Sequence, residues 1–125
     1  MVRTPSRKGG RAVSECIFCR IAAGDLPARL LRDEPDLVAI ADLHPQAPTH
    51  VLVLPRAHWT SLDAVPPQET PALGRLLAVC RDLARELELG DGYRVVVNTG
   101  PAGGQTVDHL HLHLLGGRPM AWPPG

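Results

Sequence analysis

The sequence contains few aromatic residues, few cysteines and no long apolar run, and each shortage excludes a class of protein. Aromatic residues make up 3% of the 125 residues, so each of the four deserves separate consideration. Three cysteines are too few for a disulfide framework, and they suit a reducing cytoplasm. No segment approaches the ~18 consecutive apolar residues that a membrane-spanning helix needs. We therefore expect a cytoplasmic protein without a membrane span.

Charge is balanced over the whole chain but is unevenly distributed. The sequence has 13 basic and 13 acidic residues, yet residues 1–14 contain Arg3, Arg7, Lys8 and Arg11 and no acid. The slightly acidic remainder argues against a protein that follows a nucleic-acid backbone. We expect residues 1–14 to form a disordered basic tail and residues 15–125 to form one domain. The tail lacks the apolar core of a secretory signal, although its arginines leave a mitochondrial address as the alternative.

Hydrophobic periodicity predicts an α+β domain with an antiparallel sheet. The clearest helix covers residues 70–88, where apolar side chains recur at helical spacing. Cys80 falls on that apolar stripe and is expected to be buried. A short helix is expected over residues 17–23, ending at Gly24. The predicted strands cover residues 28–34, 36–42, 50–55 and 93–99, with a short edge segment at 59–65.

Three histidines alternate with three leucines in the run DHLHLHLL. Because successive side chains of a strand point to opposite faces, a strand here would bury Leu110, Leu112 and Leu114. His109, His111 and His113 would then line the other face. Imidazole is suited to nucleophilic and acid–base chemistry near neutral pH. The alternative is a metal-chelating or merely exposed polar face.

Polar and glycine residues near this run are candidates for binding a phosphorylated ligand. Glycines in the connector 100–106, among them Gly104, allow backbone N–H groups to approach an anion, and Thr106 adds a hydroxyl donor. Asp42 ends an apolar strand, where its carboxylate could accept hydrogen bonds from ribose hydroxyls or simply form a turn. Asn98, at the end of another strand, has the same ambiguity.

Cys16 and Cys19 have the spacing of a metal-binding CxxC pair. Two further ligands would be required, and the candidates are His50 and His109. The alternatives are two packed thiols at a helix start, or a redox pair. The redox interpretation is the weakest, because no strand leads into the motif.

Several segments of the chain resemble the histidine triad (HIT) family, and in particular its Hint branch of purine nucleoside phosphoramidases. The matching segments are DLHPQAPTHVLVLPRAH at 42–58, GYRVVVNTG at 92–100, GGQTVDHLHLHLLGGRPM at 103–120 and WPPG at 122–125. The resemblance implies the HIT fold, a small antiparallel sheet with two helices, continued across a homodimer.

The resemblance also implies a nucleotide site. A purine base would lie among hydrophobic side chains, and Asp42 would bind the ribose. Other residues would contact the α-phosphate, and Trp122 would reach the partner protomer's site. The implied nucleotide-binding residues are Ile17, Phe18, Ile21, Ile40, Asp42, Leu43, Asn98, Gly104, Thr106, His111, His113 and Trp122.

The implied reaction is hydrolysis of nucleoside 5′-phosphoramidates through a nucleotidyl intermediate on His111. His113 and Thr106 would assist, and His109 would support the middle imidazole or bind zinc. No metal is required for this chemistry. HIT proteins that contain CxxC bind zinc, which here would involve Cys16, Cys19, His50 and His109 as a structural site. The alternatives are another HIT-class nucleotide hydrolase or nucleotidyl transferase, or a non-catalytic nucleotide-binding scaffold.

Overall fold

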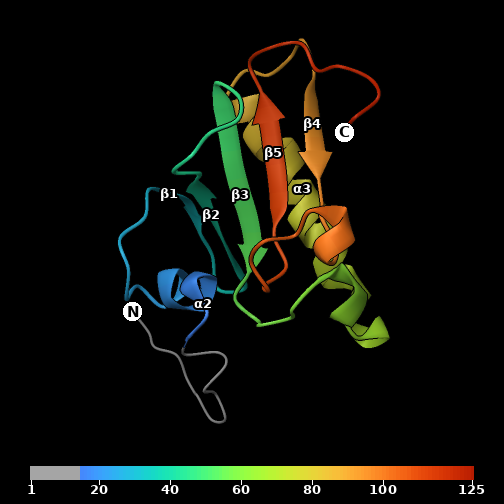
Figure 1. Cartoon of the computed structure of the whole chain (residues 1–125). Helices are drawn as coiled ribbons and strands as arrows, with labels where there is room; N and C mark the ends of the chain where they lie inside the picture. The colour runs from blue at the N-terminus through green and yellow to red at the C-terminus, as the bar shows by residue number, and fades with distance from the viewer. Residues whose placement is uncertain (1–14) are drawn as a thin grey trace.

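The computed structural model describes residues 15–125, so the expected tail at 1–14 lies outside the described residues. A five-stranded antiparallel sheet forms the centre of the domain (Figure 1). Its strands are β1 (Leu30–Asp33), β2 (Leu37–Ala41), β3 (Thr49–Pro55), β4 (Tyr93–Val96) and β5 (Leu112–Gly116). Within residues 15–125, two α-helices accompany the sheet, α2 (Ile17–Ala22) and α3 (Thr70–Glu86). This architecture confirms the predicted α+β fold.

The order of the strands in the sheet is β1-β2-β3-β5-β4. All neighbouring strands are antiparallel, and in the β3–β5 pair Val53 lies opposite Leu112 while His50 lies opposite Leu115. Strands β1 and β4 form the two edges of the sheet. The β3–β5 pair therefore brings residues 50–55 beside the histidine segment.

Each face of the sheet is covered by a separate hydrophobic cluster. Helix α3 lies behind the sheet in Figure 1 and contributes five buried residues, including Leu76, Leu83 and Cys80, to the larger cluster. The burial of Cys80 confirms that its position belongs to the apolar stripe. On the other face, Phe18 of α2 packs with Val38, Ile40, Leu52 and Leu54. Strands β2 and β3 are buried on both faces, as their near-continuous apolar sequences predict.

Two predicted strands differ from the observed structure. Residues 59–65 form no strand; Leu62–Ala64 is instead a turn of 3-10 helix. Strand β5 begins only at Leu112, so His109 and His111 precede it. His109 is fully buried rather than aligned with the other two imidazoles on an open face. The simple alternation of faces predicted for the histidine run is therefore wrong at its N-terminal end.

Among residues 15–125, no helix combines the length and the apolar character needed to cross a membrane.

Candidate active site and metal centre

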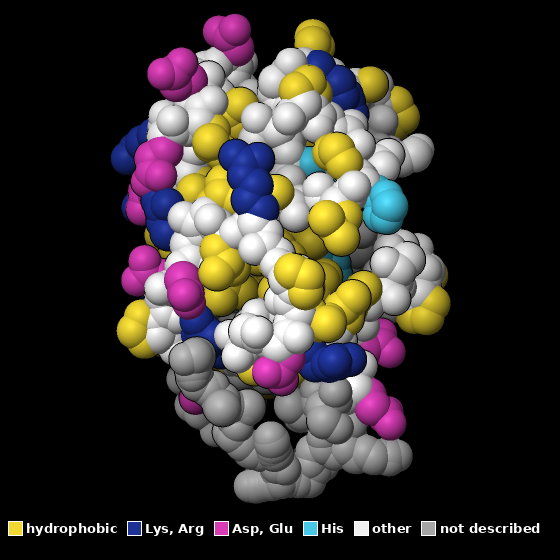
Figure 2. Space-filling model, turned by 90° about the vertical axis from the view of Figure 1, so that its left-hand side faces the viewer, with side chains coloured by type: hydrophobic (Ala, Val, Ile, Leu, Met, Phe, Trp, Pro, Cys, Tyr) yellow, Lys and Arg dark blue, Asp and Glu magenta, His cyan; other side chains and the backbone are white. Residues whose placement is uncertain are grey.

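A pocket of about 280 Å³ lies between α2, the end of β2, the middle of β3 and the histidine segment. Its walls combine hydrophobic side chains from α2 with polar side chains from β5 and the preceding loop. Figure 2 shows hydrophobic side chains gathered on one face of the molecule, with histidine side chains visible among them. The predicted site residues that line this pocket, called the base pocket below, are Ile17, Phe18, Ile21, Ile40, Asp42, Leu43, Thr106, His111 and His113.

His111 presents one unprotonated ring nitrogen. Its Nδ1 lies 2.7 Å from the backbone oxygen of His109, and because a carbonyl oxygen only accepts, Nδ1 must carry the proton. In the neutral ring, Nε2 then keeps its lone pair. Phe18 packs edge-on against this imidazole, with ring centroids 5.0 Å apart. The geometry therefore supplies a fixed imidazole whose Nε2 is available as a nucleophile.

His113 presents the opposite group, an N–H donor. The backbone N–H of Gln46 donates to His50 Nδ1 over 3.0 Å, so the His50 proton resides on Nε2. His50 Nε2 lies 2.9 Å from His113 Nδ1, which accepts that proton's hydrogen bond. The remaining nitrogen of His113, Nε2, must then be protonated. It is buried and has no partner among the described residues.

Asp42 joins this chain of hydrogen bonds. One carboxylate oxygen lies 3.3 Å from His50 Nε2, and the other accepts the backbone N–H of His44 over 2.7 Å. The carboxylate thus stabilises the orientation of His50 while it also lines the base pocket. Asp42 therefore both stabilises a local turn, through the His44 N–H, and lines the pocket.

Burial keeps the site histidines neutral. Desolvation lowers the pKa of His111 and of His50 below the ordinary imidazole value. Desolvation, reinforced by repulsion from His111 and His50, lowers the pKa of His113 to about 4. A neutral imidazole is required both for a nucleophilic Nε2 and for the tautomers described above.

The lowered pKa of His113 predicts a loss of stability on acidification. Between its ordinary pKa of 6.5 and its folded value of about 4, the unfolded chain binds a proton that the folded protein does not. The free energy of unfolding should therefore fall as the pH drops through this window, by roughly 1–2 kcal/mol from His113 at pH 5 after allowance for partial exposure. Chemical denaturation at pH 7.5 and pH 5 measures this change.

His113→Gln should reduce that pH dependence, because the amide does not titrate in this range. The matched control is His44→Gln, which makes the same exchange at an exposed histidine. Equal stability at pH 7.5 and pH 5 in the unmodified protein would contradict a buried, neutral His113.

A second cluster of side chains comprises Cys16, Cys19, His58 and His109, called the Cys–His cluster below. Phe18 connects it with the pocket, because its ring packs against both His109 and His111. The four potential ligand atoms of the cluster all lie within 4.8 Å of one another. Cys19 Sγ is 3.1 Å from His58 Nδ1, and Cys16 Sγ is 3.4 Å from His109 Nδ1. His109 Nε2 donates to the backbone oxygen of Pro55 over 2.8 Å, which leaves Nδ1 unprotonated and directed at the thiols.

The chemistry of this donor set fits zinc. Two sulfur and two imidazole ligands are a common structural zinc set, and one ring is already oriented by its carbonyl partner. The proximity of the two thiols lowers the pKa of Cys16 and raises that of Cys19. A thiolate is the form of cysteine that binds metal.

His50 does not belong to this cluster, so its prediction as a zinc ligand is corrected. It lies with Asp42 and His113 on the pocket side, and its place in the cluster is taken by His58. The strand register explains why His58 and not His50 lies in the cluster. His50 lies opposite Leu115, and Leu115 is six residues after His109, which corresponds to about 20 Å along an extended chain. Extending the same register places residue 56 opposite His109, two residues from His58. Antiparallel register was the signal that could have identified His58.

Four other predicted site residues lie apart from the base pocket. His109 directs its side chain into the Cys–His cluster and contacts His111 only through its backbone oxygen. Asn98 and Gly104 are close neighbours, since a Cβ built on Gly104 would lie 3.8 Å from Asn98 Cγ. Trp122 is 82% exposed, and the C-terminus lies at the opposite end of the sheet from α2 (Figure 1).

Comparisons with known proteins agree with this geometry. A family profile described as the HIT domain matches residues 23–120. The chain is 43% identical to a maize protein named 14 kDa zinc-binding protein, covering 90% of this chain and 89% of the relative. A solved HIT family hydrolase from Legionella pneumophila superposes with a TM-score of 0.87 at 43% identity, covering 89% of this chain and 100% of that chain. A structure described as a Zn-bound histidine triad family protein from Mycobacterium smegmatis has a TM-score of 0.73 at 33% identity, covering 85% and 77% respectively.

Proposed function

Because the chain belongs to the HIT domain family, we propose that it is a nucleotide hydrolase that cleaves nucleoside 5′-phosphoramidates of the AMP–amine type. The products are a nucleoside monophosphate and an amine. The observation that carries the proposal is the pairing of an unprotonated His111 Nε2 with an unpartnered N–H of His113 in one pocket. A hydrophobic wall for a purine completes that pocket.

In the first step, the lone pair of His111 Nε2 attacks phosphorus and the phosphorus–nitrogen bond to the amine breaks. The leaving nitrogen takes a proton from solvent, which His113 or Thr106 is placed to relay because both line the pocket. The His113 N–H and the loop around Gly104 stabilise charge on the phosphoryl oxygens without a metal ion. Asn98, the neighbour of Gly104, is assigned to the same phosphate subsite.

In the second step, water attacks the nucleotidyl group on His111. The phosphorus–imidazole bond breaks, the nucleoside monophosphate leaves, and the attacking water releases one proton to solvent, so that His111 is again neutral. Dividing one difficult displacement into two easier ones is the general advantage of covalent catalysis. His109 serves this step as a positioning residue, because its carbonyl oxygen holds the proton of His111 on Nδ1.

Substrate class is tested by comparing turnover of an AMP–amine conjugate with turnover of a dinucleoside polyphosphate. The segment Trp122-Pro123-Pro124-Gly125 favours the phosphoramidate class, because this segment distinguishes the Hint branch from the dinucleoside polyphosphate hydrolase branch. Faster turnover of the dinucleoside polyphosphate would assign the same histidines to another HIT-class reaction. Nucleotide binding without turnover of either compound would indicate a scaffold protein.

We also propose a structural zinc ion, one per chain, bound by the Cys–His cluster. The donor set and the zinc-binding relatives support this assignment. When bound, the ion would link α2 to the segments before β5 and after β3; no step of the reaction passes through it. The reduced cysteines also support our proposal of a cytoplasmic location.

A homodimer with a continuous sheet is supported by the open edge of β4. This strand pairs only with β5 among the described residues, and Tyr93 on it is 44% exposed. Pairing of two β4 strands would satisfy their free backbone groups. Since the C-terminus lies at the opposite end of the sheet from α2 (Figure 1), such a dimer would give the exposed Trp122 indole a route to the partner protomer's site.

Deleting residues 121–125 should weaken discrimination between leaving groups and leave a folded dimer. The two prolines stiffen this segment, so it can present an exposed indole with little loss of entropy on binding. We expect AMP affinity to change less than about 3-fold. The measurements are sedimentation of the truncated protein and turnover of AMP conjugates of a bulky aromatic and a small aliphatic amine. Unchanged selectivity between the two conjugates would remove Trp122 from the site.

A further inference from the structure

Helix α2 forms one wall of the base pocket but is too short to be stable alone. Ile17, Phe18 and Ile21 line the pocket from this helix, which has only six residues. Isolated helices shorter than about 12 residues are marginal in water. The position of this wall must therefore be set by contacts between α2 and the rest of the domain.

The N-terminal end of α2 is attached through the Cys–His cluster. Cys16 caps the helix, its Sγ accepting the N–H of Cys19 over 3.4 Å, and both thiols face His58 and His109. These two histidines belong to the loop after β3 and the segment before β5. Phe18, between the two cysteines, packs edge-on against both His109 and His111, with ring centroids 5.9 and 5.0 Å apart.

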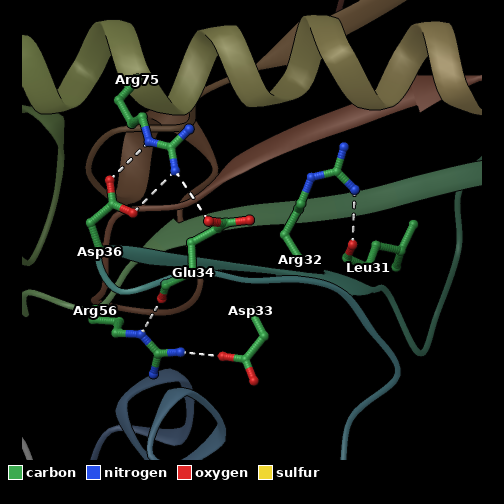
Figure 3. Close-up of polar contacts among 7 residues, drawn as sticks. All are labelled: Leu31, Arg32, Asp33, Glu34, Asp36, Arg56 and Arg75. Carbon is green, nitrogen blue, oxygen red and sulfur yellow. Dashed lines mark hydrogen bonds and ion pairs between the residues drawn. The ribbon is translucent and has the colours of Figure 1, made fainter.

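The C-terminal end of α2 is attached through Arg56. Its guanidinium donates to the backbone oxygen of Ala22, the last residue of the helix. It also donates to the backbone oxygen of Glu34 over 2.8 Å and pairs with Asp33. Figure 3 shows Arg56 between α2 and the β1–β2 turn. Arg56 and His58 lie on one loop, so the same segment contacts both ends of the helix.

We propose that zinc binding at the Cys–His cluster and purine binding in the base pocket are thermodynamically coupled through α2, with Arg56 as a second positioning residue for this wall. The inference rests on the proposed nucleotide-binding function. Without a metal ion, contacts of 3.1–3.5 Å between thiols and imidazoles join the cluster. Four metal–ligand bonds in their place fix the helix more firmly.

The coupling follows because zinc and the purine base both restrict the motion of the same helix, α2. A purine in contact with Ile17 and Phe18 would further restrict the motion of α2, and a helix already held by zinc loses less conformational entropy when the base binds. Linkage then requires that AMP strengthen zinc binding by the same factor by which zinc strengthens AMP binding. The residues that we propose bind the phosphate, His111 and His113, lie outside α2. His111 contacts the Phe18 ring and the backbone oxygen of His109, so phosphate binding should respond to zinc less than base binding does.

The test is calorimetric titration of AMP into the zinc-loaded and the chelator-treated full-length protein. We expect removal of zinc to weaken AMP binding about 10-fold, within the usual range of such couplings. Ribose 5-phosphate is the matched probe because it has the sugar and phosphate but no base, and its affinity should change less than about 2-fold. Competition with a chromogenic chelator should give about 10-fold tighter zinc binding at saturating AMP.

Arg56→Lys tests the second attachment, because one ammonium cannot replace three guanidinium contacts. It should raise KM for an AMP–amine more than it lowers kcat. Arg75→Lys is the matched control: Arg75 pairs with Asp36 and Glu34 nearby (Figure 3) but has no contact with α2 among its recorded partners. It should leave both constants unchanged.

The outcomes separate this inference from the proposed function. AMP binding that does not respond to zinc, or a ribose 5-phosphate response equal to that of AMP, would overturn the coupling and leave the function intact. A protein that binds no zinc would also overturn the coupling. Failure of the zinc-loaded protein to bind AMP at all would overturn the proposed function and the coupling with it.

Discussion

His111→Ala should reduce turnover of an AMP–amine by several orders of magnitude and leave AMP affinity within about 3-fold. The substitution removes the imidazole nitrogen that we propose attacks phosphorus, and with it the proposed route to a covalent intermediate. Binding survives because the hydrophobic wall and the His113 N–H are retained. Single-turnover rates and calorimetric AMP titration measure the two quantities.

His44→Ala is the matched control, since His44 is an exposed histidine at the rim of the same pocket. It should retain most of the turnover. Residual activity of His111→Ala within about 10-fold of the parent protein would reject the nucleophile assignment. A nucleotidyl adduct mapped to any other residue would do the same.

His58→Ala and His50→Ala should give opposite phenotypes. His58 supplies a ligand atom of the Cys–His cluster, so its removal should weaken zinc binding at least about 100-fold, more than loss of an outer hydrogen bond to a ligand. Turnover at saturating substrate should persist, because no step uses the metal. His50→Ala should instead keep one zinc per chain and lower kcat about 100-fold, the scale of general acid–base assistance.

The effect of His50 is transmitted through His113. Without the His50 N–H, Nδ1 of His113 no longer has a donor, so the tautomer that directs an N–H into the pocket is no longer fixed. Elemental analysis and steady-state kinetics on both variants provide the test, with circular dichroism to confirm folding. Loss of zinc in His50→Ala, with retention in His58→Ala, would restore the ligand set predicted from the sequence.

The sequence predicted what local periodicity determines. The apolar stripe of α3, including buried Cys80, and the nearly all-apolar β2 and β3 follow directly from spacing. The pocket-lining residues followed from the resemblance to the HIT family, and the structure places most of them together. These features depend on which side chains share a face, which a sequence largely encodes.

Features that depend on distance between segments were predicted less well. CxxC spacing indicates two metal ligands, but His58 joins them only because β3 and β5 pair in one particular register. The bend before β5 buries His109, and alternation alone gave no sign of it. Tautomers were also beyond the sequence, since they depend on carbonyl and amide groups such as those of His109 and Gln46.

The stereochemical course at phosphorus tests the covalent mechanism most directly. The substrate is an AMP–amine analogue made chiral at phosphorus with sulfur, hydrolysed in water enriched in oxygen-18. Attack by His111 and then by water inverts the configuration at phosphorus twice. The two-step mechanism therefore predicts a thiophosphate product with retained configuration. Inverted configuration would mean that water displaces the amine in a single step, and it would contradict a nucleotidyl-His111 intermediate.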